Sequence, residues 1–416
     1  MQPMADRLGV DHQRLQQFVT ASTWDTQAVR ARLARRAIEV VEPVAWAVDD
    51  TGFPKDGTAS PCVARQYSGT LGKVGNCQIG VSVHAVTDGA SCPLNWRLFV
   101  PESWDAVKAA PAAVKAANAK RRKTLKNAPR AALPATPAGP GRQTGGDIGG
   151  DIGGEVDVEA VTEAAQARRR RCGIPEGEKH RPKWMMVVEM LDELATSGLR
   201  PPALAADAGY GDTSQFRAAL DERNIVYSVQ VKPDALAHTA EAVPVTRVWS
   251  GQGRCGRPPA STTAVYPDKA VSLARHALAA GRHATLTVTW RQGSKGRLSS
   301  QFVFLRVRPA GHRIARDSHG SLPERWLIAE WPDSEPEPVT YWLSSLPADT
   351  SPTDLVRYAK IRWRIEHDYR ELKTGLGLDH FEGRSWTGWH RHVTLVTAAH
   401  LFITMLRHDP KADAPA

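Results

Sequence analysis

The sequence lacks the features that identify several common classes of protein. Only five cysteines occur among its 416 residues, and none forms a Cys-x-x-Cys pair, which argues against a zinc module and favours a reducing compartment. No apolar run is long enough to cross a bilayer, and no secretory signal is visible. A phosphate-binding P-loop and a Ser-His-Asp grouping are also absent. We therefore expect a cytoplasmic protein with another kind of chemistry.

What the chain has in excess is positive charge. It contains 54 Lys and Arg against 44 Asp and Glu, a net charge of +10. Such an excess favours an anionic partner such as nucleic acid, although many soluble proteins are mildly basic. The chain is also long enough for two or three domains and a large core.

Two apolar segments predict strands that are buried on both faces. The first, at 44–48, ends in the letters DDTG, and the second, at 202–206, ends at Asp207. A helix and a further strand follow the second segment, which together indicate an α/β unit. Residues 233–350 instead show short alternating strands, typical of a mainly antiparallel β-rich region.

Composition changes abruptly between these strands. Residues 106–183 hold a Lys/Arg/Ala run, a Pro/Ala stretch, the repeat GGDIGGDIGG and the four arginines from Arg168 to Arg171. The segment has few aromatic or branched apolar residues with which to build a core. We therefore predict a basic, mostly disordered insertion.

A charged helix is predicted near the C-terminus. Ser351 is suited to cap its start, and Gly375 and Gly377 are suited to end it. At 100° per residue, four polar side chains of this helix lie within about 60° of one another beside an apolar stripe. They are Arg362, Glu366, Tyr369 and Lys373. This pattern suits a site in which the Glu366 carboxylate holds a metal ion while the neighbouring cations bind an anionic polymer. It also suits a solvated helix face with ion pairs between its side chains.

Three carboxylates from distant parts of the chain form a candidate site. Asp50 and Asp207 end the two buried strands, where open α/β sheets place their active sites, and the helix presents Glu366. Three such acids can hold two Mg²⁺ or Mn²⁺ ions that activate a water or a 3′-hydroxyl and stabilise the leaving oxygen of a phosphodiester. The alternative for each aspartate is a turn residue or a helix cap.

These segments together resemble a known family. The letters VDDTG, ADAGYGD and RWRIExxYRELK are similar to those of DDE transposases of bacterial insertion sequences, in the group with a Tyr-Arg-Glu-Lys signature. The resemblance covers roughly 1–105 and 184–405. It implies an α/β fold of the RNase H-like type. Such a fold has a mixed sheet flanked by helices, a β-rich insertion before the C-terminal catalytic helix, and a small N-terminal helical region.

The resemblance also assigns roles to residues. It implies that Asp50, Asp207 and Glu366 are the catalytic metal ligands, with Asp49 as a rival for the first place and Asp212 and Glu371 as weaker rivals. Contacts to DNA are expected from Arg362, Lys373 and Tyr369. The signature tyrosine itself has no match, since Ala359 stands at its position and Tyr358 is one residue away.

The resemblance implies a transposase that binds the terminal inverted repeats of its element, cleaves there with two Mg²⁺ ions (Mn²⁺ is the other candidate) and joins the ends to target DNA. A homodimer on paired ends in a bacterial cytoplasm, associated with the nucleoid, is expected. The alternatives are a DNA-binding remnant or regulator that no longer cuts, and another RNase H-like metal nuclease. The predicted parts are a DNA-binding helical region (1–42), the core (43–105, 184–232 and 351–405), the basic insertion (106–183), the β-rich insertion (233–350) and a tail (406–416).

Overall fold

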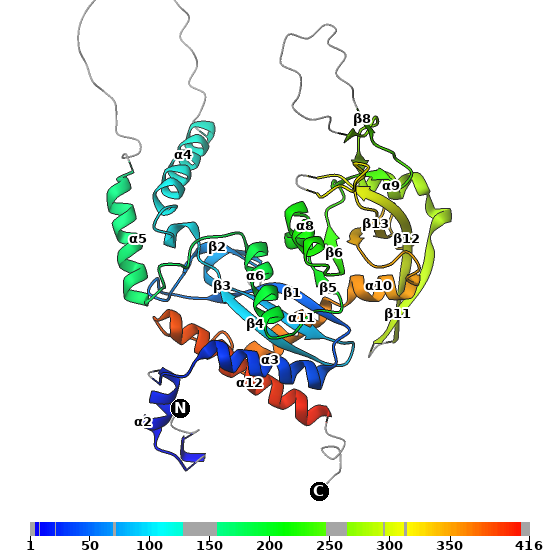
Figure 1. The fold of residues 1–416 in the computed structure, drawn as a ribbon. Helices are drawn as coiled ribbons and strands as arrows, with labels where there is room; N and C mark the ends of the chain where they lie inside the picture. Colours follow the sequence, from blue (N-terminus) through cyan, green and yellow to red (C-terminus); the bar gives the residue numbers. More distant parts are fainter. Residues whose placement is uncertain are drawn as a thin grey trace, which may run out of the picture.

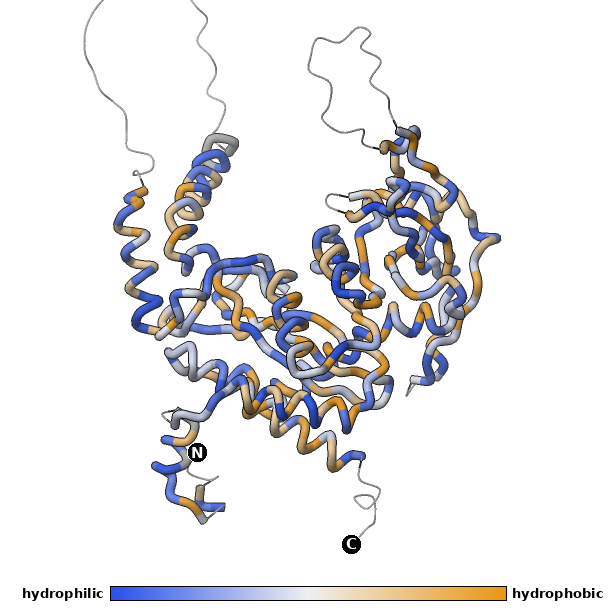
Figure 2. Tube along the Cα trace, in the orientation of Figure 1, coloured by the Kyte–Doolittle hydropathy of each residue, from blue (hydrophilic) through white to orange (hydrophobic). Residues whose placement is uncertain are grey.

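The computed structural model describes residues 5–7, 9–20, 22–69, 72–127, 156–246, 264–293, 296–311 and 314–408. They form one large mixed sheet flanked by helices, as predicted for an RNase H-like fold (Figure 1). Hydrophobic residues gather along the central strands and along the helices that cover them (Figure 2). Within these ranges, no helix combines the length and the apolar character that crossing a bilayer requires.

The centre of the sheet is built from both predicted strand groups. Its strands are β1 (Ala45–Pro54), β2 (Ala64–Ser68), β3 (Lys73–Val86), β4 (Ser91–Leu98), β5 (Leu204–Ala206) and β6 (Tyr227–Val231). β1 pairs antiparallel with β3 and parallel with β5, and β5 pairs parallel with β6. The parallel register aligns Val48 with Ala206, so Asp49 in β1 and Asp207 after β5 lie side by side. β1 does not end where the sequence predicted, because it continues through Asp49 and Asp50 to Pro54, paired with β3.

The β-rich insertion continues this sheet. Its strand β14 pairs antiparallel with β6, so the central sheet extends outward through β13 and β12. The elements of this region are β7 (Leu236–Thr239), β8 (Val245–Thr246), β9 (Ala264–Val265), β10 (Val271–Ser272), α9 (Leu273–Ala280), η2 (Arg282–Ala284), β11 (Leu286–Gly293), β12 (Gly296–Pro309), β13 (Arg325–Glu330) and β14 (Thr340–Ser344). The pair β8–β9 forms a small sheet of its own.

Helices cover the central strands on both faces. They are α3 (Thr26–Val41), α6 (Lys183–Thr196), α7 (Ala208–Gly211), α8 (Ser214–Glu222), α10 (Pro352–Lys360), α11 (Trp363–Thr374) and α12 (Trp386–His408), whereas α2 (His12–Thr20) packs against α12. Trp46 and Val48 pack in a core with α6 and α8, whereas Ala45 and Ala47 pack in a second core with α11 and α12. The alternation along β1 therefore directs Asp50 toward α6 and Asp49 toward α11.

The N-terminal helix α3 belongs to the core. Its Arg30 is buried and donates to the side chain of Asn95, to the carbonyl of Trp96 and to the hydroxyl of Thr394 on α12. Burial lowers the pKa of this guanidinium to about 10. This part of the predicted 1–42 region therefore closes the core, and only α2 precedes it among the described helices.

The basic insertion differs from its prediction. We predicted a mostly disordered segment at 106–183, but its described residues include α4 (Ala109–Asn127) and α5 (Val158–Cys172), which stand side by side as an arm beside the short helix η1 (Glu102–Trp104) (Figure 1). Asp157 caps α5 by accepting from the Ala160 amide, and Gly173 ends it at φ 64°. The prediction for the Gly-Asp repeat lies outside the described residues.

The predicted C-terminal helix is divided in two. Ser351 caps its start as expected, accepting from the Asp354 amide at 3.1 Å. The helix then breaks at Ile361 and Arg362, so that α10 ends at Lys360 and α11 begins at Trp363. Arg362 therefore precedes the helix that carries Glu366 instead of lying within it.

Candidate active site

The parallel pair β1 and β5 brings the predicted acids of the two strands together. Asp49 and Asp50 follow Val48, and Asp207 follows Ala206, its partner in the sheet. Asp207 also caps α7, accepting from the Tyr210 amide at 3.3 Å. Asp207 follows the last residue of β5, whereas Asp49 and Asp50 lie within β1, which stays paired with β3 as far as Pro54.

Arg362 joins the first strand to the predicted catalytic helix. Its Nη1 lies 2.6 Å from Oδ2 of Asp49, and its Nη2 lies 2.6 Å from Oε1 of Glu366. The Asp49 side chain is 15% exposed and that of Glu366 is 57% exposed. The guanidinium of Arg362 therefore bridges a nearly buried acid, Asp49, and an exposed acid, Glu366.

The environment of Asp49 favours its protonated form. Burial raises the pKa of Asp49 to about 7, against the lowering effect of Arg362, and the charges of Asp207 and Asp50 raise it further. The pKa of Asp207 is also raised, mainly by burial, with Arg362 opposing and Asp50 adding to the shift. The three aspartates thus repel one another, and the cluster has more negative charge than its partners neutralise.

Asp50 has partners that the sequence did not suggest. Nζ of Lys183, at the first residue of α6, lies 2.9 Å from Oδ1 of Asp50, and the Tyr210 hydroxyl donates to its Oδ2 at 3.2 Å. Burial, followed by the charge of Asp50, raises the pKa of Tyr210 well above its usual range. Tyr210 stands in the segment ADAGYGD, which the sequence analysis singled out, whereas no local pattern marks Lys183, 133 residues from Asp50.

In this arrangement the acids Asp49, Asp50, Asp207 and Glu366 do not form a metal site. Within the described ranges, no group of three His, Cys, Asp or Glu side chains lies close enough together to hold an ion. Glu366 turns toward Arg362 instead of toward the aspartates. Carboxylate oxygens are the ligands that Mg²⁺ and Mn²⁺ prefer, so Asp50, Asp207 and Glu366 are the residues here whose chemistry suits such an ion.

Two residues predicted to touch DNA face the interior. Lys373 donates from Nζ to the carbonyl of Gly52 at 2.8 Å, and burial lowers its pKa. Tyr369 is 8% exposed, and its hydroxyl lies 2.7 Å from Oγ of Ser82 on β3. In this conformation, both side chains attach α11 to the sheet, and neither is directed toward a ligand outside.

A buried polar network continues from Tyr369 beneath the site. Ser82 Oγ lies 2.9 Å from Nε2 of His84, whose Nδ1 lies 2.7 Å from Oδ2 of Asp368 on α11. Burial alone would raise the pKa of Asp368, but the hydrogen bond and charge of His84 lower it overall. Asp368 also accepts from Ser91 of β4. This network fixes α11 on β3 and β4, and the sequence analysis missed it because its members lie far apart in the chain.

The weaker rivals are engaged elsewhere. Asp212 lies 3.1 Å from Nζ of Lys232, and Glu371 accepts from Arg407 on α12. Glu371 also lies 3.4 Å from Nε2 of His400. Each of these acids has its own cation away from Arg362.

Comparison with known proteins identifies the family of the chain. A family model for DDE superfamily endonucleases matches residues 1–143 and 155–297, which include the three aspartates and stop before Glu366. The probable transposase for insertion sequence element IS701 of Microchaete diplosiphon is 22% identical over 386 residues, 91% of this chain and 70% of that protein. Since the family model matches well over half of the chain, the protein belongs to the DDE superfamily of endonucleases.

Proposed function

We propose that the protein is a DNA transposase of a bacterial insertion sequence. It would bind the terminal inverted repeats of its element, cut phosphodiester bonds there and transfer the strands to target DNA, acting as a homodimer on paired ends. The observation that carries the proposal is the cluster of Asp49 and Asp50 on β1 with Asp207 at the end of the parallel strand β5, joined through Arg362 to Glu366. The likeness to the IS701 protein supports the same reading.

The proposed metal ligands are Asp50, Asp207 and Glu366. Their oxygen donors suit Mg²⁺ or Mn²⁺. Burial is the main cause of the raised pKa of Asp207, and the neighbouring charge of Asp50 adds to it, a charge that a divalent cation would offset. When two such ions are bound, they supply an activated water or 3′-hydroxyl and stabilise the leaving oxygen. Asp49 lies on the Glu366 side of β1 and is the rival for the first position.

Arg362 is the residue that we propose to contact the DNA phosphate. Its guanidinium already lies against two carboxylates, and the same planar fork matches a phosphate with two parallel hydrogen bonds. Release of Glu366 to the metal would free one side of this fork for DNA. Lys373, which we also predicted to touch DNA, would instead hold the end of β1 through Gly52.

A strand-transfer assay tests the proposal. The purified protein is incubated with Mg²⁺, a plasmid target and duplex DNA that carries the inverted repeat from the region flanking its gene. Joined products are expected, and their loss is expected with EDTA or with Glu366→Ala. Asp333→Ala is the matched control, because the Asp333 side chain is 81% exposed in the β-rich region. Cutting without joining would indicate another metal nuclease, and binding without cutting would indicate a non-cleaving remnant.

A further inference from the structure

The arm formed by α4 and α5 carries an unusual concentration of positive charge. The sequence of α4 contains six basic residues and no acidic residue. The basic residues are Lys115, Lys120, Arg121, Arg122, Lys123 and Lys126. Like charges at this density repel one another along a helix, so an anionic partner would stabilise the arm.

The base of the arm is firmly attached to the core. Arg169 is buried and donates to the carbonyls of Trp104 and Pro175, at 3.2 Å and 2.8 Å. Arg168 donates to the Ser103 carbonyl at 2.7 Å, and its guanidinium lies 5.1 Å from the centre of the Trp104 ring. Two of the four consecutive arginines of α5 therefore serve as structural anchors that fix the direction of the arm.

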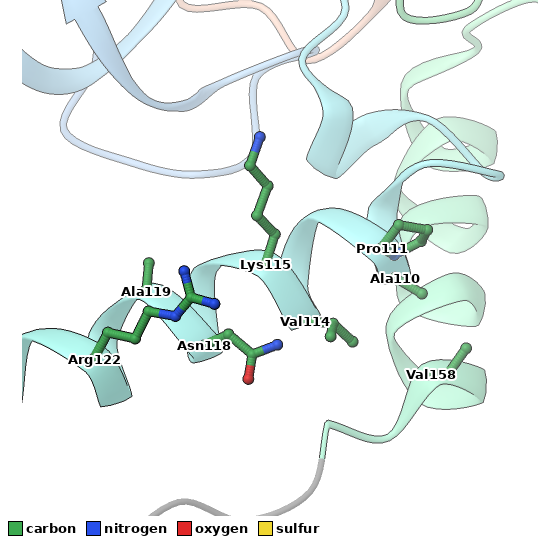
Figure 3. Close-up of a pocket in the computed structure, with 8 residues that line it drawn as sticks. All are labelled: Ala110, Pro111, Val114, Lys115, Asn118, Ala119, Arg122 and Val158. Atoms are coloured by element: carbon green, nitrogen blue, oxygen red, sulfur yellow. The ribbon is translucent and has the colours of Figure 1, made fainter. Parts of the chain in front are cut away.

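Four basic residues of α4 lack anchoring contacts of this kind among the described residues. Lys115, Arg121, Arg122 and Lys123 are exposed, and in the part of the chain that the structure describes none lies within 4 Å of an acidic side chain. Lys115 and Arg122 line an open groove of about 840 Å³ along one face of α4 (Figure 3). Seven residues separate these two, which is about 10 Å along the helix axis.

The chain connects this arm closely to the candidate active site. After α5 ends at Cys172, only a short segment leads to Lys183, whose Nζ lies 2.9 Å from Asp50. Asp105, at the base of α4, accepts from the His180 amide at 2.7 Å and so fixes this segment to the arm. DNA that rests on α4 would therefore have a defined position relative to Asp50.

We infer that the exposed basic face of α4 binds the phosphate backbone of duplex DNA outside the cleavage site, an inference that rests on the proposed function. The phosphates of DNA are regularly spaced negative charges that would neutralise these cations. Contacts from Lys and Arg to phosphates do not depend on the DNA sequence. A protein partner fits less well, because the centres of protein interfaces are depleted in charged residues, and in lysine above all.

Salt dependence of binding provides the test. The full-length triple variant Lys115→Gln, Arg122→Gln, Lys123→Gln is compared with the matched control Lys269→Gln, Arg275→Gln, Arg297→Gln, which removes the same charge from exposed sites of the β-rich region. Affinity for a duplex of unrelated sequence is measured by fluorescence anisotropy between about 50 and 200 mM salt. We expect the arm variant to bind more weakly, with a slope of log K against log salt that is shallower by about 2–3. The control should retain the wild-type slope.

Each other outcome overturns the inference in a defined way. An unchanged slope in the arm variant, or an equal change in the control, would mean that α4 is not the contact. If sedimentation showed that the arm variant loses a wild-type oligomer while its salt slope is kept, the surface would bind protein. The proposed function would survive all of these, since it is tested by strand transfer, whereas failure of the wild-type protein to bind any duplex would refute both. Far-UV circular dichroism checks that α4 remains helical, as glutamine permits.

Discussion

The guanidinium of Arg362 lies 2.6 Å from the carboxylate of Asp49, although 313 residues separate the two in the chain. The same guanidinium holds Glu366. In the arrangement observed, Arg362 is therefore the cation that keeps the strand carboxylate and the helix carboxylate near each other. Its effect on stability and its proposed contact with phosphate can be separated by experiment.

Arg362→Met should destabilise the protein strongly. Asp49 is nearly buried, so removing its cation leaves a poorly solvated acid, and breaking such a pair costs roughly 3–5 kcal/mol. Thermal unfolding at pH 8 measures the loss. Arg407→Met is the control, because it breaks a pair with Glu371 in which the arginine side chain is 57% exposed, worth about 0–1 kcal/mol. Equal, small losses in both variants would mean that Arg362 contributes only as a surface residue.

The protonation of Asp49 should make stability depend on pH. Its pKa is raised to about 7 in the folded protein from 3.8 when unfolded, so the folded state binds the extra proton. Stability from this group is therefore fully present below about pH 4 and is lost as the pH rises toward 7. Asp49→Asn should unfold at a higher temperature than the wild type at pH 8, and the difference should vanish at pH 4. A difference that is the same at both pH values would contradict the assignment.

The first proposed metal ligand can be identified directly. Asp50→Ala, Asp207→Ala and Glu366→Ala should each abolish Mg²⁺-dependent cleavage while binding to end DNA persists, because phosphate contacts come mainly from Lys and Arg. Asp49→Asn should retain measurable cleavage. If Asp49→Asn is inactive and Asp50→Ala still cuts, the first ligand is Asp49. Cleavage is followed on labelled end DNA, and binding by gel shift.

Lys183 should compete with metal for Asp50. Its ammonium lies 2.9 Å from Oδ1, so replacing it with methionine removes a positive charge from the site to be filled by Mg²⁺. Lys183→Met should lower the Mg²⁺ concentration at which the rise in thermal midpoint is half-maximal. Lys179→Met, an exposed lysine nearby, should leave that concentration unchanged. Weaker Mg²⁺ binding in Lys183→Met would mean that the lysine supports the metal site.

Tyr369 should act through stability. Its hydroxyl is buried against Ser82, so Tyr369→Phe removes one buried hydrogen bond and should lower the free energy of unfolding by about 1 kcal/mol. Urea unfolding measures this change, and a gel shift with end DNA should show no loss of affinity. If Tyr369→Phe bound DNA more weakly at unchanged stability, the result would support the contact between Tyr369 and DNA that the sequence predicted.

Local signals predicted much of the fold. The apolar runs predicted the positions of β1 and β5, although β1 continues past its predicted end to Pro54. Ser351 caps α10 as expected, and the sheet is mixed and flanked by helices. Helix signals in the arm were available but were outweighed by composition. Alanine has the highest helix propensity, and α5 has both an Asp cap and a Gly stop. The break at Ile361 has no glycine or proline to mark it.

The sequence predicted that Asp50 and Asp207 would lie close together, but it did not predict their partners. The apolar run before each aspartate indicates a buried strand, and pairing of the two strands brings the acids together. Lys183 and the network around Asp368 depend on contacts between distant segments. Periodicity contains no information about such contacts, because they are decided by packing of whole elements.

The order of the acids along the chain also affects synthesis. Translation up to residue 207 produces both strand aspartates, but β1 must wait for β5 before the two can align, and Glu366 follows Asp207 by another 159 residues. α12, which packs on the distant helix α3, is made after Glu366. Such long-range pairing slows folding. A nascent or prematurely terminated chain that stops before Glu366 therefore lacks an acid of the proposed site, so the proposed metal ligands are all present only after three distant segments have been made.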